Sequence, residues 1–273
     1  MNLTDVNWST TLFMVALHVL ALMAFLPQFF SWGGVLWMLG LYYITLCWGI
    51  TTGFHRLVSH RSFKTPRWLE RFLVTCGTLA MQHGPIDWIG LHRHHHKYSD
   101  QDNDHHDSNK GFWWSHMGWM LYKVPAMEHV DKFTKDLQKD PYYVWLNQNF
   151  VIPQVILGVI LYVLGGWSYV IWGVFVRLVL CYHLTWTINS VTHKWGKDHW
   201  VTEDKSRDNV WVSLVTFGEG HHQGHHCFPW SSKHNLVGGP DITYGHIRLL
   251  EMLGLCWDVK VPTQEELDKK RKV

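Results

Sequence analysis

The stretch Gly-Leu-His-Arg-His-His-His-Lys-Tyr-Ser at residues 90–99 decides how the rest of the chain is interpreted. Its histidines have the spacing i, i+3, i+4, which places the three imidazoles of His92, His95 and His96 on one face of a helix. Three imidazoles on one face predict a metal site. The same spacing returns downstream and a further pair lies upstream, at His222, His225, His226 and at His55, His60.

Chance alone does not explain these clusters. The chain has 21 histidines in 273 residues. Random placement would give about one or two pairs with four residues between them, but only roughly 0.1 triplets of this spacing. Two triplets and a pair, each at the edge of an apolar segment, therefore indicate metal binding.

Composition favours a membrane protein. Hydrophobic residues make up 47% of the chain, yet the mean hydropathy is −0.09, so apolar spans must alternate with long polar segments. The five cysteines are scattered without a Cys-x-x-Cys pair, which argues against a disulfide framework or a thiolate metal site. The net charge of +2 and the lack of an internal basic run give no reason to expect a nucleic-acid partner.

Four uncharged or nearly uncharged runs predict an all-α integral membrane protein with two helical hairpins. The runs Thr11–Phe30 and Gly34–Phe54 form the first hairpin, residues 11–54. A Gly165-Gly166 break divides the second hairpin, residues 151–188. We expect Arg177 in this hairpin to find a buried partner. We expect His18 to make a packing or weakly polar contact rather than to bind a metal, because the run around it is otherwise apolar and no other histidine is near it in sequence.

An even number of crossings returns the chain to the same side of the membrane. Residues 55–150 and 189–273 then form one helical cap, and 1–273 form a single domain. Of the 24 Lys and Arg residues, 12 lie in the first cap segment, 11 in the second and one within a span, whereas the hairpin turns have none. The positive-inside rule therefore predicts that the cap, both termini and all the His clusters are cytosolic.

The eight clustered histidines together with His193 suit two metal ions with four or five ligands each. His193 follows Asn189 at i+4 where the fourth span ends, so both can face the same site. His55 and His60 are about 140° apart on a regular helix. Either the second span ends between them or they serve different metals. Imidazole suits iron, zinc, copper and nickel alike, and spare His, Asp or Asn residues should orient the ligands from behind.

The order of the motifs resembles the membrane fatty-acyl desaturases of the delta-9, stearoyl-type class. The residues that carry the resemblance are His-Arg-Leu-x-Ser-His-Arg-Ser-Phe-Lys, His-Arg-x-His-His-Lys-Tyr-Ser, Gly-Phe-Trp-Trp-Ser-His-Met-Gly-Trp, Asn-Ser-x-x-His and Gly-Glu-Gly-x-His-x-x-His-His-x-Phe-Pro. The resemblance as a whole extends from about Gly34 to Trp230 and includes both hairpins.

The resemblance implies an enzyme with two iron ions that uses dioxygen and two electrons to form a cis double bond in a long saturated acyl chain. It also implies the iron ligands, with Asn189 acting through water: His55, His60, His92, His95, His96, His193, His222, His225 and His226. No haem-domain sequence such as His-Pro-Gly-Gly occurs in the chain. We therefore expect a separate electron donor, either a ferredoxin or a small haem cytochrome.

Two departures from the family pattern matter. His221 stands where an aromatic residue usually follows Gly-Glu-Gly, so a frame of His221, His225 and His226 is an alternative to the favoured His222 frame, which keeps the i, i+3, i+4 face. Gly90-Leu91 replaces the Arg-Asp that is implied to bind coenzyme A in animal acyl-CoA desaturases. This version resembles bacterial, cyanobacterial-type enzymes that act on lipid-bound acyl chains, and it leaves the acyl carrier open.

The second span leads to His55, so residues that precede His55 in this span should limit the length of the acyl tail. Cys47 and Tyr43 lie about 12 and 18 Å back along an α-helix at 1.5 Å per residue. We expect one of them to form the floor of the pocket, and Trp186 to line the pocket near the metals.

Two rival functions fit parts of the pattern. A hydroxylase of acyl or alkyl chains could share the scaffold and the ligands. A metal transporter or metal-binding membrane protein is the rival from another class, but transport ligands belong inside the spans, whereas these clusters lie at span ends.

Overall fold

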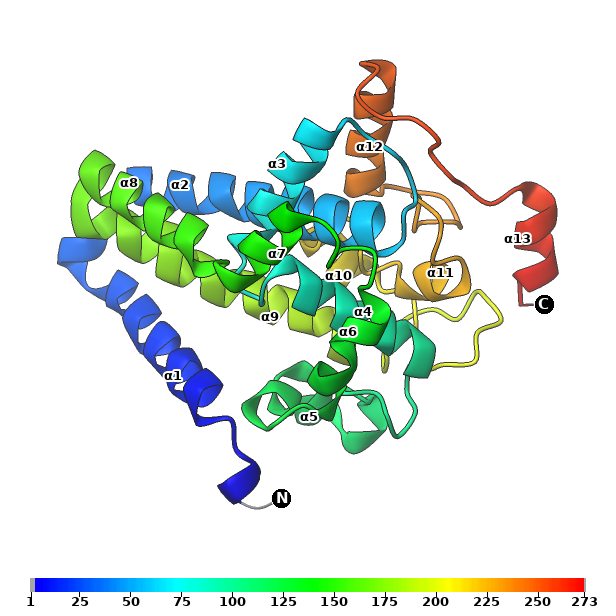
Figure 1. The fold of residues 1–273 in the computed structure, drawn as a ribbon, viewed down its shortest axis with the longest axis horizontal. Helices are drawn as coiled ribbons and strands as arrows, with labels where there is room; N and C mark the ends of the chain where they lie inside the picture. Colours follow the sequence, from blue (N-terminus) through cyan, green and yellow to red (C-terminus); the bar gives the residue numbers. More distant parts are fainter. Residues whose placement is uncertain (1–2, 273) are drawn as a thin grey trace.

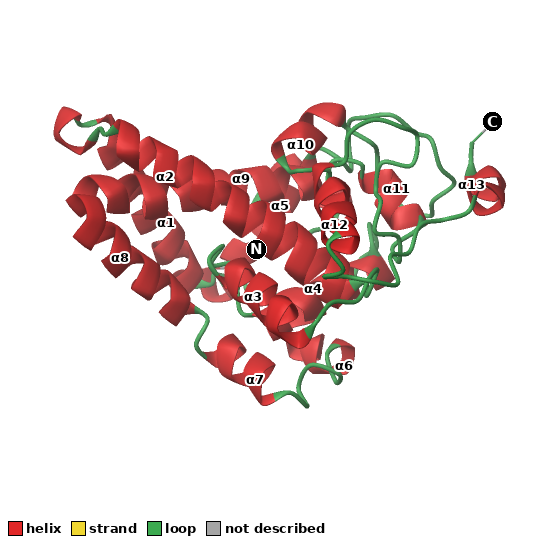
Figure 2. Ribbon diagram, turned by 90° about the horizontal axis from the view of Figure 1, so that it is seen from above, coloured by secondary structure: helices red, strands yellow, loops and turns green. Residues whose placement is uncertain are grey.

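The computed structural model describes residues 3–272, which fold into helices and connecting loops without a β-strand (Figure 2). The apolar hairpins lie at one end of the molecule and the His-bearing helices at the other (Figure 1). The predicted all-α fold is therefore confirmed for the described residues.

The first hairpin begins with α1 (Trp8–Leu22), and its return arm is α2 (Trp32–Tyr42), which continues without a break as the π-helix η4 (Tyr43–Ser59). Two short 3-10 turns, η2 (Met23–Phe25) and η3 (Pro27–Phe29), connect the arms. The predicted end of this arm at Phe54 is wrong, because the helix extends five residues further.

The wide turns of η4 are supported by hydroxyl side chains. Thr51 and Thr52 both donate to the carbonyl of Cys47, at 2.6 and 2.8 Å, and Ser59 donates to the carbonyl of Phe54 at 2.7 Å. Such side-chain bonds to carbonyls four or five residues back compete with the regular α-helical ladder. The sequence pattern of apolar residues gives no sign of this change in helix type.

The second hairpin contains α8 (Val151–Val170), the π-helical segment η8 (Ile171–Val176) and α9 (Arg177–Ser190). Gly165 and Gly166 have non-helical backbone angles and break α8, and Gly166 has a φ of 62°, a conformation that glycine adopts without strain. The side chains of Gln154 and Arg177 meet at 2.5 Å. Residues 23 apart on one straight helix would be about 35 Å apart, so the chain reverses at the glycines, as the sequence predicts.

Three helical segments within residues 3–272 are long and apolar enough to cross a membrane: Trp8–Phe25, Trp32–Ser59 and the broken segment Val151–Ser190. Their mean hydropathies are 1.8, 1.4 and 2.0. Many apolar side chains on them are exposed, among them Leu12, Val19 and Val163. An outer surface of this kind suits lipid rather than water.

The remaining helices form the cap. Between the hairpins lie α3 (Arg67–Thr78), α4 (Pro85–Tyr98), η5 (Ser108–Lys110), α5 (Phe112–His116), η6 (Gly118–Leu121), η7 (Pro125–His129), α6 (Val130–Phe133) and α7 (Pro141–Gln148). After the second hairpin come α10 (Val210–Val215), α11 (His222–Cys227), α12 (Ile242–Met252) and α13 (Gln264–Lys270), and η1 (Leu3–Asp5) precedes α1.

Helix α3 packs unusually closely on η4. A Cβ atom added at Gly49 would lie 2.4 Å from the backbone nitrogen of Gly77, and one added at Gly53 would lie 2.9 Å from the carbonyl oxygen of Leu73. Small residues allow two helix backbones to approach in this way. The contact fixes the end of η4, and so the position of His55 relative to the cap.

Two polar residues inside the spans have partners. Arg177 is fully buried and donates to the Thr45 hydroxyl at 2.6 Å, the Leu79 carbonyl at 2.9 Å and the Gln154 side chain. His18 makes a polar contact, since its Nε2 lies 3.1 Å from Nε2 of His183. The partner comes from the other hairpin, which local sequence cannot reveal.

We expect Arg177→Leu to destabilise the protein by about 3 kcal/mol or more, because the buried Thr45, Gln154 and Leu79 acceptors would lose their donor. Thermal unfolding of the detergent-purified protein measures the change. The matched control is Arg248→Leu on α12, whose side chain is half exposed and pairs with Glu251; its effect should stay within about 0.5 kcal/mol. Equal unfolding temperatures for the two variants would contradict the structural role of Arg177.

Candidate metal centre

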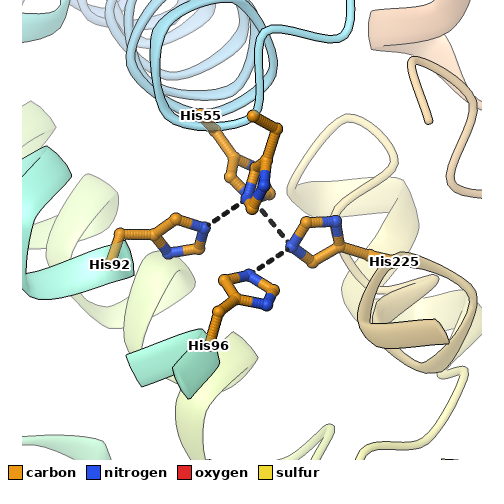
Figure 3. Close-up of side chains that lie close together, drawn as sticks. His55, His92, His96 and His225 are labelled. Atoms are coloured by element: carbon orange, nitrogen blue, oxygen red, sulfur yellow. Dashed lines mark hydrogen bonds between the residues drawn. The ribbon is translucent and has the colours of Figure 1, made fainter. Parts of the chain in front are cut away.

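Five histidines converge at the junction of the first hairpin and the cap. We call them the five-histidine group: His55 on η4, His60 at its C-cap, His92 and His96 on α4, and His225 on α11. One ring nitrogen from each lies within 4.8 Å of the others. Figure 3 shows the rings of His55, His92, His96 and His225 pointing toward one another from these three helices.

The π-helix explains how His55 and His60 join one group. The His60 N–H donates to the His55 carbonyl at 3.1 Å, an i→i+5 bond. The wider turn that such bonds close brings residues five apart closer to one face than an α-helix does, and the two rings are 4.9 Å apart between centroids. The two rings therefore lie in one potential ligand group. The helix ends at Ser59, between the two residues, as the first of the two alternatives expects.

Four more histidines form the adjacent four-histidine group: His95 on α4, His193 in the turn after α9, and His222 and His226 on α11. Nε2 of His193 lies 2.9 Å from Nε2 of His222. The two groups are neighbours, since the His96 and His226 rings are 4.6 Å apart between centroids.

Each triplet is divided between the groups, so the prediction that one triplet forms one metal site is wrong. On an α-helix, residues i and i+4 are about 40° apart, whereas i+3 lies about 60° to the other side. His92 and His96 accordingly face the five-histidine group and His95 the other. The arrangement is reversed on α11, where His222 and His226 share a group and His225 leaves it.

The ring nitrogens have the spacing that a metal requires. Two nitrogens bound at right angles, each about 2.1 Å from one ion, are about 3.0 Å apart. The Nε2 atoms of His60 and His92 are 2.7 Å apart, and those of His225 and His96 are 2.8 Å apart. The buried Nε2 atoms of His95 and His226 have no hydrogen-bond partner among the described residues, which fits the placement of a cation beside them.

The protonation states also favour metal binding. Burial, reinforced by neighbouring imidazoles, lowers the pKa of five rings well below the ordinary value: His60, His92, His96, His222 and His225. These rings are therefore neutral at pH 7, the form that binds metal. His95 differs, because Asp104 outweighs the effect of burial and raises its pKa.

Four carboxylates orient the ligand rings, because each accepts a hydrogen bond from the Nδ1 of one histidine. The distances are 2.5 Å for Glu219 and His55, 3.0 Å for Asp104 and His95, 2.9 Å for Asp100 and His193, and 2.7 Å for Asp204 and His226. A carboxylate on Nδ1 fixes the tautomer, so Nε2 presents its lone pair to the metal.

The carboxylates themselves are held ionised. Burial alone would raise the pKa of Asp104, but His95 and His106 outweigh burial and lower it; His193 and His226 do the same for Asp100 and Asp204. Glu219 also accepts from the fully buried Arg56 at 2.9 Å, and Arg56 in turn pairs with Asp241 at 3.0 Å. The network links α11 and the 219–241 segment to η4.

Sequence reasoning expected orienting residues but did not identify these four. Asp100 and Asp104 belong to a polar segment after α4 that had no visible role, and Glu219 stands in the Gly-Glu-Gly motif. His234, which is isolated in sequence, is fully buried and lies in a potential ligand cluster with His55 and Glu219. The signal in the sequence that could have identified these carboxylates is that Asp and Glu residues stand close to the His motifs.

All nine predicted histidines lie in the two groups, and His222 rather than His221 is among them. His221 instead precedes α11 as its N-cap residue. Asn189 lies on α9 one turn before His193, and its contact through water stays a prediction. The His geometry thus follows the favoured motif frame.

The residues expected at the acyl tail lie in two separate places. The Tyr43 hydroxyl contacts Nε2 of His246 on α12, and Cys47 Sγ lies 3.4 Å from Nδ1 of the same ring. Trp186 is buried on α9, where it stacks on Tyr182 at 5.3 Å. The structure brings Tyr43 and Cys47 together but does not bring Trp186 to them.

Comparison with known proteins identifies the scaffold that carries these groups. The family model described as fatty acid desaturase matches residues 31–237. The chain belongs to the fatty acid desaturase family. The resemblance that the motifs indicate is thereby confirmed, and the protein is an oxidoreductase that desaturates fatty acyl chains.

The relatives of this desaturase cover nearly all of it. It is 52% identical over 263 residues to the sn-1 stearoyl-lipid 9-desaturase of Anabaena variabilis. The aligned region covers 96% of this chain and 97% of the relative. It is 50% identical to the protein of the same name from Synechocystis sp., over 96% and 83% of the two chains. A palmitoyl-monogalactosyldiacylglycerol delta-7 desaturase of Arabidopsis thaliana is 41% identical, over 92% and 68%.

Proposed function

We propose that this desaturase introduces a cis double bond at carbon 9 of a saturated acyl chain esterified to a membrane lipid, using two iron ions. The observation that carries the proposal is the convergence of nine histidines into two adjacent groups. The names of the two most similar relatives described above, both stearoyl-lipid 9-desaturases, support the position and the carrier.

The residues have distinct proposed roles. The five-histidine group would hold one iron and the four-histidine group the other, with Asn189 acting through water. When bound, the irons would supply the redox chemistry that activates dioxygen for hydrogen removal. Dioxygen, two electrons, two protons and the two hydrogens removed from the chain give two water molecules. The carboxylates on Nδ1 would keep the ligand rings in one tautomer throughout this reaction.

The proposed topology has four spans with the metal centre and both termini in the cytosol. The reversal at Gly165-Gly166 supports two crossings within Val151–Ser190, although the first arm is short. The distribution of Lys and Arg supports the cytosolic side for the cap. Electrons would arrive from a separate ferredoxin or small haem cytochrome bound to the cytosolic face.

The packing of α4 supports a lipid rather than coenzyme A as the acyl carrier. A Cβ atom added at Gly90 would lie 2.6 Å from Cγ1 of Val130, and Leu91 is buried. An arginine at position 90 would therefore have to displace the side chain of Val130. This close packing supports the absence of the Arg-Asp pair of the acyl-CoA pattern from this chain.

Expression in a host without an endogenous desaturase tests the proposed function. Mass spectrometry of the extracted fatty acids, with the double bond located by chemical derivatisation, should detect a cis monounsaturated chain with its double bond at carbon 9. A host with no new monounsaturated product, or with hydroxylated chains instead, would contradict the proposal.

Tyr43 or Cys47 would limit the length of the acyl tail. We expect Tyr43→Ala to shift the product ratio toward longer chains by roughly tenfold, because an added cavity accommodates further methylenes. Gas chromatography of the products measures the ratio. The matched control is Tyr43→Phe, which keeps the ring but loses the hydroxyl contact with His246 and should retain the wild-type ratio. An unchanged ratio in Tyr43→Ala would remove this role.

A further inference from the structure

Helix α12 has apolar residues on both its inner and its outer face. On the inner face, Ile247 and Leu250 pack against the hydrophobic core. On the outer face, Leu249 and Met252 are 47% and 74% exposed, and Leu253, which directly follows the helix, is 63% exposed. A helix at a protein–water surface carries polar residues on its outer face. The outer face of α12 therefore suits an apolar partner rather than water.

The exposed apolar residues form one stripe along the helix. At 100° per residue, Ile242, Leu249 and Leu253 lie within about 40° of one another. Arg248 and Glu251, which pair with each other, lie about 100° and 160° around the helix from Leu249. An apolar stripe with charged residues along its flank is typical of a helix that lies in a membrane interface.

The contacts of α12 place it at membrane depth. His246 on α12 contacts the Tyr43 hydroxyl, and its ring lies 6.4 Å from the ring of Trp48. Both partners belong to the candidate span Trp32–Ser59. Trp48 follows the exposed Trp32 by 16 residues, which is at most about 24 Å along a helix. The hydrocarbon core of a bilayer is about 30 Å thick, so a helix beside Trp48 lies at the edge of this core and not above it.

The orientation of α12 agrees with this depth. Figure 1 shows α12 crossing the direction of the hairpin helices α2 and α8. Because the spans cross the membrane, a helix perpendicular to them lies along the membrane surface. Helix α3 reaches the same level, since its exposed residue Phe72 lies 6.1 Å from Trp48 between ring centroids. The exposed apolar surface of the spans thus continues onto α3 and α12.

Cations border this apolar surface. Arg67 and Arg71 on α3 and Arg248 on α12 each have about half of the side chain exposed. Basic side chains next to an apolar helix face attract the phosphates of lipid headgroups. The combination of an apolar stripe and neighbouring arginines therefore favours a phospholipid leaflet as the partner.

We infer that α12 lies in the membrane interface, with Leu249, Met252 and Leu253 among the acyl chains of the leaflet next to the cap and Arg248 at the level of the headgroups. The inference goes beyond the proposed function, because it concerns a lipid contact of the cap and not the reaction. His246 joins α12 to η4, the helix that carries His55. The lipid contact of α12 thereby keeps the metal centre at a fixed height relative to the membrane surface.

Spin-label accessibility in lipid nanodiscs tests the inference without relying on activity. In the full-length protein, p-acetylphenylalanine replaces Leu249 or Met252 and carries a nitroxide, so the five cysteines stay unchanged. Power saturation compares collisions with dioxygen, which dissolves in lipid, and collisions with a water-soluble nickel chelate, each relative to a sample under nitrogen. At both positions the ratio of dioxygen to nickel collisions should be at least about tenfold higher than at a site in water.

Two reference positions calibrate the measurement. Val163, exposed in the candidate span Val151–Ser190, represents lipid, and Asp268, exposed on α13, represents water. Ratios at Leu249 or Met252 close to that at Val163 support the inference, and either position suffices if the other label prevents folding. Ratios close to that at Asp268 would overturn it. Low collision rates with both reagents, together with dipolar coupling between labels on two chains, would also overturn it, because a second copy of the chain would then cover α12.

Discussion

We expect His225→Ala to reduce the monounsaturated product at least about 100-fold, since loss of a direct ligand should exceed the 10- to 100-fold effect of losing an orienting partner. His225 is fully buried, and its Nε2 lies 3.0 Å from Nε2 of His55 and 2.8 Å from Nε2 of His96. It is the residue of α11 that joins the five-histidine group. Its removal opens the group on the side opposite α4.

The iron content of the purified variant separates a lost ligand from a lost fold. It should fall by about one ion per chain, because the four-histidine group keeps its own ligands. The matched control is His129→Ala, an exposed histidine outside both groups, which should keep wild-type product and iron. Wild-type product from His225→Ala would mean that the five-histidine group does not hold a catalytic metal.

The second large effect is expected at an orienting carboxylate. Asp104→Asn should lower activity by about 10- to 100-fold. Asp104 is almost fully buried, and its Oδ2 accepts from Nδ1 of His95 at 3.0 Å and from the backbone N–H of Asp100 at 3.0 Å. Asparagine has nearly the same shape but no charge, so the tautomer of His95 and the basicity of its Nε2 are no longer fixed.

The same loop provides the control for this change. Asp102 is exposed two residues away, and Asp102→Asn should keep wild-type activity. Product formation in cells and the iron content of the purified variants are compared at equal expression. If Asp104→Asn retained full activity and full iron, the hydrogen bond to His95 would be a structural contact without influence on the metal.

The sequence allowed the histidines to be identified because their spacing repeats a helical period. His92 and His96 lie one turn apart, so their common direction follows from α-helical geometry. Likewise, Gly165-Gly166 is a visible break in an apolar run, and the hairpin there follows. These features depend on residues that are close in sequence.

Features that depend on distant residues or on unusual backbone geometry could not be predicted. The alignment of His55 and His60 requires a π-helix. Hydrogen bonds from Thr51, Thr52 and Ser59 to backbone carbonyls support this helix, whereas the pattern of apolar residues gives no sign of it. The pairing of Asp204 with His226 joins residues 22 apart, with helix α10 between them. Which triplet member faces which group became clear only when α4 and α11 were placed opposite each other.

The most direct test of the central claim is the iron content of the purified full-length wild-type protein, measured by inductively coupled plasma mass spectrometry against protein concentration. The account predicts about two iron ions per chain, one for each histidine group. A protein that is active as a desaturase but contains one iron per chain, or holds zinc in place of iron, would contradict it.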